Sequence, residues 1–88
     1  MKVEFRSSFA KDLRKIKEQN VRQQVREVIQ AVESAESLQD VGNLKKLRVG
    51  DRYYRIRVGD YRIGFLLEGD TLVFVRFLSR KDIYKYFP

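Results

Sequence analysis

Apolar and polar positions along the chain follow two different periods, and the change between them separates a helical first half from a strand-rich second half. Residues 2–6 alternate between charged and apolar side chains, which is the period of a half-buried strand. Phe9, Leu13 and Ile16 then recur at spacings of four and three residues, as on one face of a helix. The chain is therefore predicted to begin with a short strand and an amphipathic helix.

A second amphipathic helix is predicted after Asn20, fading near Leu38. Its apolar positions share one face: Val21, Val25, Val28, Ile29 and Val32. Ser7 or Ser8 is expected to cap the first helix and Asn20 the second, because their side-chain oxygens can accept hydrogen bonds from free N–H groups of the first turn. The short join between the helices predicts an antiparallel hairpin with both apolar stripes in the core.

From Leu44 onward the pattern is that of strands, after a loop around Gly42. Three segments are expected to form strands: residues 53–58, 61–68 and 72–78. The last of them is an almost continuous apolar run, which indicates a strand covered on both faces. The element order predicts one α+β domain over residues 1–88: a strand, a two-helix hairpin and a three-stranded antiparallel meander, with the helices packed on one face of the sheet. The pattern leaves room for a short helix after Ser79.

Positive charge is concentrated in the second half of the chain. Residues 1–40 hold 8 basic and 7 acidic side chains, a net charge of +1, whereas residues 41–88 hold 11 and 5, a net charge of +6. A localised positive field favours a polyanion or an acidic protein as the partner. The alternative interpretation is a basic surface that only keeps the protein in solution.

The composition excludes several kinds of chemistry. The chain has no cysteine and no histidine, so disulfides, thiolate metal sites, cysteine nucleophiles and histidine-based triads are ruled out. No convincing set of metal ligands is present, so neither a metal nor another cofactor is expected. The chain starts without an apolar signal core and has no run of about 20 apolar residues, which predicts a cytoplasmic protein that does not use a membrane.

The most informative motif is a predicted hairpin that carries three arginines. Gly59 would be the first residue of a two-residue type II′ turn, which sets Arg57 directly opposite Arg62. Arg55 would then lie opposite Gly64 on the same face, with the alternating apolar residues on the core side. Like charges opposite one another destabilise an exposed pair by about 0.2–1 kcal/mol. The conflict predicts that a phosphate or carboxylate normally lies between these guanidinium groups, with Gly64 leaving room for a ligand to approach the sheet.

Further basic and aromatic residues flank this hairpin. The upstream cations are Lys45, Lys46, Arg48 and Arg52, and the C-terminal segment contains Arg80, Lys81, Tyr84, Lys85, Tyr86 and Phe87. Cations interleaved with rings suit RNA, because cations hold phosphates while rings stack on unpaired bases. Phe87 is instead expected to close the core, and both roles stay open for Tyr84 and Tyr86.

A solvated role is the alternative for the cations. The hairpin arginines could point apart into water or pair with Asp51, Asp60 or Glu68. Lys45 and Lys46, taken singly, are more typical of solvated charges than of specific ligands.

The run from Tyr54 to Ile63 resembles the signature hairpin of the RelE/ParE toxin superfamily, and residues 80–84 look like its C-terminal basic-then-tyrosine motif. The predicted element order also agrees with that family over almost the whole chain. The resemblance implies a toxin of a microbial type II toxin–antitoxin or plasmid-maintenance module, neutralised by an antitoxin encoded beside it. RelE-like members cut mRNA in the ribosomal decoding site, where the RNA 2′-hydroxyl attacks the adjacent phosphate.

The resemblance implies roles for single residues as well. Arg62 matches the arginine that stabilises charge on the phosphate, Arg80 matches the one that aids the leaving group, and Tyr84 matches the tyrosine that stacks on or positions the base, with Tyr86 as a rival. The residues predicted to be catalytic are Arg57, Arg62, Arg80 and Tyr84. The residues predicted to bind substrate are Lys45, Lys46, Arg55, Lys81 and Tyr86.

The chain departs from better-characterised RelE members, which have lysines where it has Arg55 and Arg57. Arginine stays protonated in proteins, so Arg57 is a poor general base and is expected to stabilise charge on the phosphate instead. Removal of the 2′-hydroxyl proton would then fall to Lys45, Lys46, Tyr54 or ribosomal RNA.

The expected partners are the cognate antitoxin, the ribosome and mRNA. The antitoxin is expected to contribute an acidic or amphipathic segment that covers the basic surface. The main alternative function is that of ParE-like toxins, which poison DNA gyrase on the same scaffold without RNA chemistry. An inactive relative or a simple nucleic-acid binder is a further alternative. A nucleic-acid binder would show an affinity for nucleic acid that depends steeply on salt, and it would produce no cleavage products.

Overall fold

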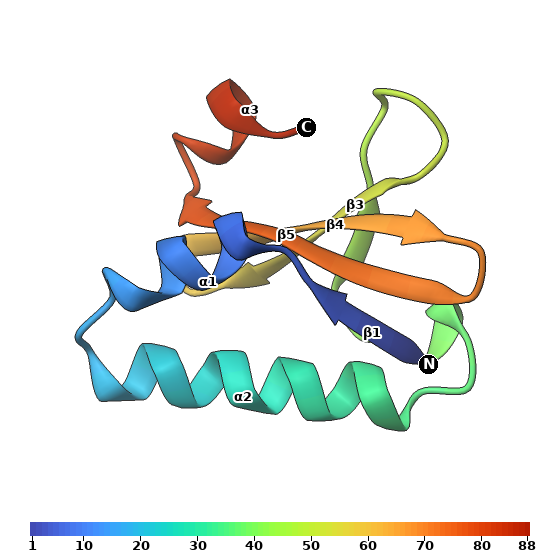
Figure 1. The fold of residues 1–88 in the computed structure, drawn as a ribbon, viewed down its shortest axis with the longest axis horizontal. Coiled ribbons are helices and arrows are strands. Elements are labelled where there is room, and N and C mark those ends of the chain that lie inside the picture. The colour runs from blue at the N-terminus through green and yellow to red at the C-terminus, as the bar shows by residue number, and fades with distance from the viewer.

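The computed structural model describes residues 1–88 and contains five strands and three α-helices (Figure 1). The elements are β1 (Lys2–Phe5), α1 (Ser7–Arg14), α2 (Gln19–Ser34), the short 3₁₀ helix η1 (Leu38–Asp40), β2 (Leu44–Lys46), β3 (Tyr53–Val58), β4 (Tyr61–Glu68), β5 (Thr71–Ser79) and α3 (Ile83–Tyr86). No helix has both the length and the apolar character needed to cross a membrane. The predicted α+β class is confirmed, and a short helix does follow the last strand.

The strands form a single sheet in the order β1-β5-β4-β3-β2. The predicted meander, β3 to β5, is antiparallel, and the structure extends it at both ends: β2 pairs with β3, and β1 lies parallel to β5. The long helix α2 covers one face of the sheet, while α3 lies above the opposite face (Figure 1). The sheet therefore has a helix-covered face and a second face that only the C-terminal segment partly covers.

The arginine hairpin has the predicted register. Arg57 lies opposite Arg62 and Arg55 lies opposite Gly64. Gly59 adopts φ +58°, the positive value that the first central residue of a type II′ turn requires. The turn thereby fixes which side chains of both strands share a face.

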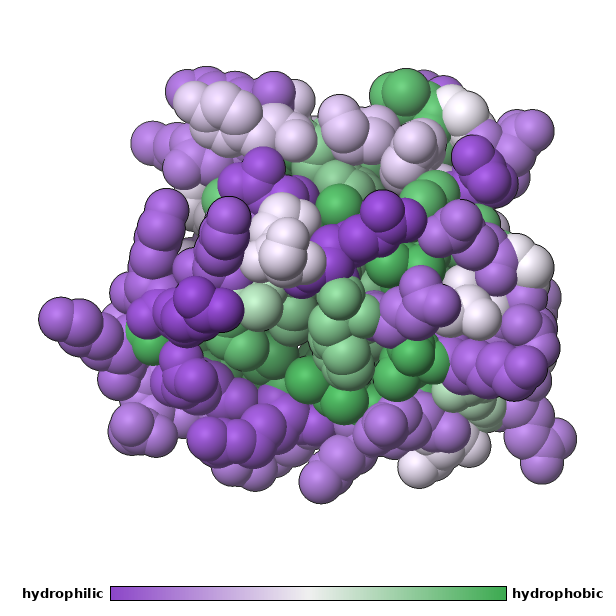
Figure 2. Space-filling model, viewed as in Figure 1, coloured by the Kyte–Doolittle hydropathy of each residue, from purple (hydrophilic) through white to green (hydrophobic).

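The hydrophobic core lies between α2 and the sheet. Its buried residues are Phe9, Val25, Val32, Ala35, Val41, Ile56, Val58, Ile63, Phe65, Leu72, Phe74 and Phe77. In β5, consecutive side chains from Leu72 to Phe74 are fully buried, which confirms for the first half of this strand that it is covered on both faces. On the surface drawn in Figure 2, apolar side chains come into view in a band between α2 and the sheet, with hydrophilic side chains around them.

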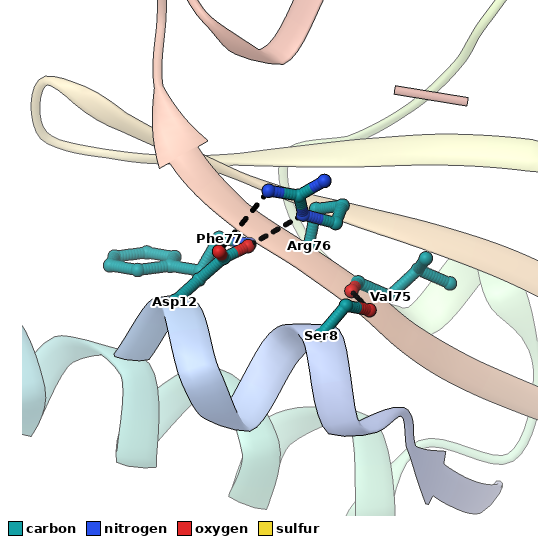
Figure 3. A network of polar contacts seen from close by, with 5 residues as sticks. All are labelled: Ser8, Asp12, Val75, Arg76 and Phe77. Atoms are coloured by element: carbon teal, nitrogen blue, oxygen red, sulfur yellow. Dashed lines mark hydrogen bonds and ion pairs between the residues drawn. The ribbon is translucent and has the colours of Figure 1, made fainter. Parts of the chain in front are cut away.

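Helix α1 completes the edge of the sheet where β1 ends. β1 pairs with only the first half of β5, and α1 runs along the rest of that edge (Figure 3). The Ser8 hydroxyl donates to the carbonyl oxygen of Val75 at 2.6 Å, and the backbone N–H of Phe77 donates to Oδ2 of Asp12 at 3.0 Å. Two side chains four residues apart on one helix face thus make the hydrogen bonds that a neighbouring strand would otherwise make.

The predicted helix caps are wrong. The residues that precede the first turns are Arg6 and Glu18, and neither makes a side-chain capping bond; Asn20 lies inside α2. Ser7 and Ser8 are the first two residues of α1, and the Ser8 hydroxyl bonds the sheet edge rather than the first turn of the helix.

Helix α2 also ends at Ser34, earlier than the predicted fade near Leu38. A capping box between Ser37 and Asp40 starts the separate 3₁₀ helix η1 there.

Candidate functional site

The arginines of the hairpin line a small polar pocket on the face opposite α2. This arginine pocket has a volume of about 260 Å³ and no apolar lining residue. Its lining residues are Asn43, Lys45, Arg55, Arg57 and Arg62. Four of the five side chains are cations, so the pocket suits an anionic group such as a phosphate.

The pocket is built from two like-charge pairs on adjacent strands. Arg57 faces Arg62 across β3 and β4, and Lys45 faces Arg55 across β2 and β3. The second pair was not predicted, because the loop between β2 and β3 hides the register of β2 from the sequence. Each such pair opposes folding, so this arrangement favours an anion between the cations.

Arg62 lies at the centre of the positive charge. Its Nη1 donates to the carbonyl oxygens of Gly59 at 3.1 Å and Tyr61 at 2.9 Å, which holds the side chain near the hairpin turn. Its Nε is buried without a hydrogen-bond partner. Partial burial lowers the pKa of the Arg62 guanidinium, and the positive charges of Arg55 and Arg57 lower it further. An anion in the pocket would relieve this repulsion.

None of the hairpin arginines has an acidic partner. The ion pairs of the molecule join Lys2 to Asp70, Arg6 to Glu68, and Arg76 to Asp12. Glu68, one of the acids that could have neutralised the hairpin, is therefore engaged by Arg6 at 3.1 Å. The alternative in which Asp51, Asp60 or Glu68 pairs with the hairpin arginines is not what the structure contains.

A second, larger pocket adjoins the arginine pocket and shares Lys45 and Arg55 with it. We call it the loop cleft, because it lies between the β2–β3 loop and the C-terminal segment. It has a volume of about 510 Å³ and is lined by Lys45, Lys46, Leu47, Arg48, Val49, Arg55, Tyr84, Phe87 and Pro88. The cleft brings Lys46 and Tyr84 into the neighbourhood of the hairpin arginines.

The two C-terminal tyrosines line different pockets. Tyr84 is 64% exposed and lines the loop cleft, which it shares with Arg55. Tyr86 lines two other pockets, both of which include Arg76. Of the two rivals, only Tyr84 lines a pocket that adjoins the hairpin arginines.

The remaining C-terminal cations differ in position as well. The backbone N–H of Arg80 donates to the carbonyl oxygen of Asp60 at 2.9 Å, and its charge lowers the pKa of Arg62. Arg80 therefore lies beside the hairpin turn. Lys81 is exposed and lines none of the pockets.

The expectation that Gly64 leaves room for a ligand is wrong, because Phe87 fills that space. A Cβ added at Gly64 would lie 2.7 Å from the Phe87 ring. The ring is 6% exposed and meets Tyr53 edge-on at 5.7 Å between ring centres. The prediction that Phe87 is buried as part of the packing is confirmed, although it packs on the face opposite α2.

The candidates for a proton acceptor also differ in position. Tyr54 belongs to the core-facing side of β3, where it packs partly buried against the hydrophobic core. Lys45 lines the arginine pocket, and Lys46 lines only the loop cleft. No group of three or more Asp, Glu, His or Cys side chains that could hold a metal ion occurs.

Comparison with known proteins finds relatives that match nearly the whole chain. The sequence model of the family described as the ParE toxin of type II toxin–antitoxin systems, parDE, matches residues 3–84. Toxin RelE3 of Methanocaldococcus jannaschii is 44% identical over 89 residues. The alignment covers 100% of this chain and 100% of that toxin.

Solved structures give the same result. In the RelB–RelE antitoxin–toxin complex from Methanococcus jannaschii, a chain 40% identical superposes with a TM-score of 0.81, covering 97% of this chain and 99% of that one. The isolated RelE toxin of E. coli shares the fold, with a TM-score of 0.67 at 20% identity over 96% of this chain and 90% of that one. The chain belongs to the RelE/ParE superfamily of type II toxin–antitoxin toxins.

Proposed function

We propose that this toxin is a metal-independent endoribonuclease that cuts translated mRNA on the ribosome. The RNA 2′-hydroxyl oxygen attacks the adjacent phosphorus while the bond to the 5′-oxygen breaks. A base accepts the 2′-hydroxyl proton, and the 5′-oxygen gains a proton as it leaves. The products are a 2′,3′-cyclic phosphate and a free 5′-hydroxyl.

The observation that carries this proposal is the set of hairpin arginines that lack acidic partners and line one polar pocket. Negative charge grows on the phosphate oxygens as the 2′-oxygen attacks, and fixed cations stabilise that charge more than they stabilise the ground state. Arg57 and Arg62 face each other across the pocket, and backbone carbonyls hold Arg62 in place. A donor that is already oriented does not have to be reorganised during the reaction.

The other residues follow from their positions around the pocket. Arg55 lines both pockets and would bind the phosphate backbone, Arg80 beside the turn would assist the departing 5′-oxygen, and Tyr84 would stack on or position a base. Lys45 is the amine best placed to take the proton, in its neutral form, unless ribosomal RNA supplies the base. Lys81 and Tyr86 lie outside the pocket and would contribute at most to binding of flanking RNA.

The partner that restrains this activity would be an antitoxin encoded beside the toxin. A 40% identical relative was solved as the toxin of a RelB–RelE antitoxin–toxin complex, which supports such a partner here. The positive second half of the chain favours an acidic or amphipathic segment on the antitoxin. Co-expression with the adjacent open reading frame should relieve the toxicity, and failure of its product to bind would contradict this part of the proposal.

Brief induction of the protein in cells, followed by mapping of new mRNA 5′ ends, tests the proposal. We expect cuts within translated messages, and loss of at least about 100-fold in cutting for Arg57→Ala and Arg62→Ala, a typical loss for removal of one charge-stabilising donor. Lys17→Ala, an exposed cation in the α1–α2 connection, serves as the control. Cutting that persists in both arginine variants would contradict the assignment of this pocket.

Inhibition of DNA gyrase is the second candidate, because the matching family model is that of the ParE toxin. This function needs a protein-binding surface and no reaction at a phosphate. Induction would then arrest replication and produce DNA breaks while mRNA stays intact. That outcome would replace the nuclease with a gyrase poison on the same scaffold.

A further inference from the structure

We infer that the loop cleft is a binding site for one unpaired RNA base, and that the β2–β3 loop selects this base. The inference rests on the proposed nuclease function, in which Tyr84 already stacks on or positions a base, and goes beyond it because it assigns base selection to Val49 and the β2–β3 loop. Val49, Leu47 and the C-terminal residues Phe87 and Pro88 would form the apolar walls of this site. Tyr84 would provide the ring on which the base stacks.

The two adjoining pockets have complementary chemistry. The arginine pocket has no apolar lining residue, whereas the loop cleft combines apolar walls with a rim of cations. A nucleotide has this same division between an anionic phosphate and a flat, largely apolar base. Because Lys45 and Arg55 line both pockets, a phosphate held in one would place its neighbouring base in the other.

The inner wall of the cleft is held rigidly. Gly64 lets the Phe87 ring lie directly on β4, and the ring of Tyr53 supports it edge-on at 5.7 Å. A preorganised wall loses little side-chain freedom when a base binds, so more of the stacking free energy appears as affinity. Phe87 therefore does not block the site but forms part of it.

The outer wall is short and anchored at its base. The N–H of Leu47 donates to the carbonyl oxygen of Tyr53 at 2.8 Å, which closes the loop of residues 48–52. Val49 is 60% exposed although it is apolar, and it lines the cleft. Arg48, its neighbour, adds a further cation to the rim. An exposed apolar side chain in an otherwise charged loop suits contact with a base.

Binding of a single-stranded oligodeoxynucleotide with one 2-aminopurine tests the site, since this probe has no 2′-hydroxyl and cannot be cut. We expect stacking in the cleft to quench its fluorescence in complex with the wild-type protein. Val49→Ser should weaken binding by up to about tenfold and remove much of the quenching, without changing the salt dependence. Arg57→Ala should instead lower the slope of the logarithm of the binding constant against the logarithm of the salt concentration by about one. The quenching of the bound probe should stay intact. Gln39→Ser, an exposed neutral substitution elsewhere, is the control.

Mapping of mRNA 5′ ends with the same variants separates this inference from the proposed function. Val49→Ser should still cut mRNA but with a broader range of bases beside the cut. Wild-type cleavage combined with an unchanged base distribution and unchanged quenching in Val49→Ser would overturn the base site alone. A wild-type protein that neither cuts mRNA nor binds the probe would overturn the nuclease and the base site together. Weaker antitoxin binding by Val49→Ser, with unchanged probe binding, would reassign the cleft to the antitoxin and overturn the inference.

Discussion

The two faces of the sheet come from the same strands, but they differ in the surroundings of their side chains. One face buries apolar side chains together, and the other holds cations that have no acidic partner. On the face under α2, alternate hairpin residues such as Ile63 and Phe65 are fully buried in apolar surroundings. On the opposite face, the intervening residues set Arg57 against Arg62 and Lys45 against Arg55 without an acid between them. Apolar burial on the first face stabilises the fold, whereas repulsion between cations on the second face destabilises it.

The second face is itself divided. Arg76 of β5 lies opposite Gly64 on this face, and its guanidinium bonds Asp12 through Nε at 2.7 Å and through a second nitrogen at 3.2 Å (Figure 3). The side-chain hydrogen bond with Asp12 raises the pKa of Arg76, whereas burial and neighbouring cations lower that of Arg62. Arg76 has an acidic partner, whereas Arg62 bonds only backbone carbonyl oxygens. The contrast indicates which of them is available for a ligand.

The largest expected effect is on the helix-covered face. Phe65→Ala removes a fully buried ring that meets Phe74 at 4.7 Å between ring centres. We expect a loss of about 3–5 kcal/mol in the free energy of unfolding, measured by urea titration. Tyr84→Ala removes an exposed ring on the other face and should leave unfolding nearly unchanged while reducing cleavage. Equal losses of stability in the two variants would contradict the contrast between the faces.

The ion pair of Asp12 and Arg76 should give the next largest effect. Asp12→Ala removes the partner of Arg76 and leaves the N–H of Phe77 without an acceptor. We expect the free energy of unfolding to fall by about 3 kcal/mol. This value is near the low end for a broken buried ion pair, because the Arg76 side chain is partly exposed to water. Thermal unfolding measures it, with Asp12→Asn as the variant that retains an acceptor oxygen and should lose less. A loss no larger than that of Lys17→Ala would show that this edge of the sheet does not depend on Asp12.

Local patterns were sufficient to predict the register of the arginine hairpin. A two-residue turn at Gly59 leaves no freedom in how the flanking strands pair, so the Arg57–Arg62 contact followed directly from the sequence. The opposition of Lys45 and Arg55 could not be predicted in the same way, because a longer loop joins their strands and allows several registers. Predictability therefore depended on the length of the connection.

Contacts between distant segments account for two of the predictions that were wrong. Serine is a residue type typical of helix caps, but the Ser8 hydroxyl donates a hydrogen bond to the carbonyl oxygen of Val75 at the sheet edge instead. Gly64 was expected to make room for a ligand, but the ring of Phe87 packs there. Both competing partners lie far along the chain, and no local pattern marks them. The position of Tyr84 rather than Tyr86 near the arginines also depends on how the C-terminal segment docks.

Gly64→Ala tests the close packing of the C-terminal segment on the arginine-bearing face. The new Cβ would lie 2.7 Å from the ring of Phe87, so the ring must shift. We expect a loss of about 1–3 kcal/mol in the free energy of unfolding, the usual range for overpacking. In a Phe87→Ala background the same substitution should be nearly neutral, which a double-mutant cycle in urea measures. The same loss in both backgrounds would place its cause in the strand itself.

The smallest expected effect has the opposite sign, and it tests the cost of the like-charge pair directly. Arg57→Glu puts an acid opposite Arg62, so the free energy of unfolding should rise by about 0.2–1 kcal/mol while mRNA cleavage is lost. Thermal unfolding at low salt and at about 1 M salt measures it, and the gain should shrink at high salt because exposed charges are screened. Arg26→Glu on α2 makes the same change in net charge away from the pocket and should not give this gain. A loss of stability in Arg57→Glu alone would mean that the hairpin arginines stabilise the fold, and that their lack of acidic partners carries no functional information.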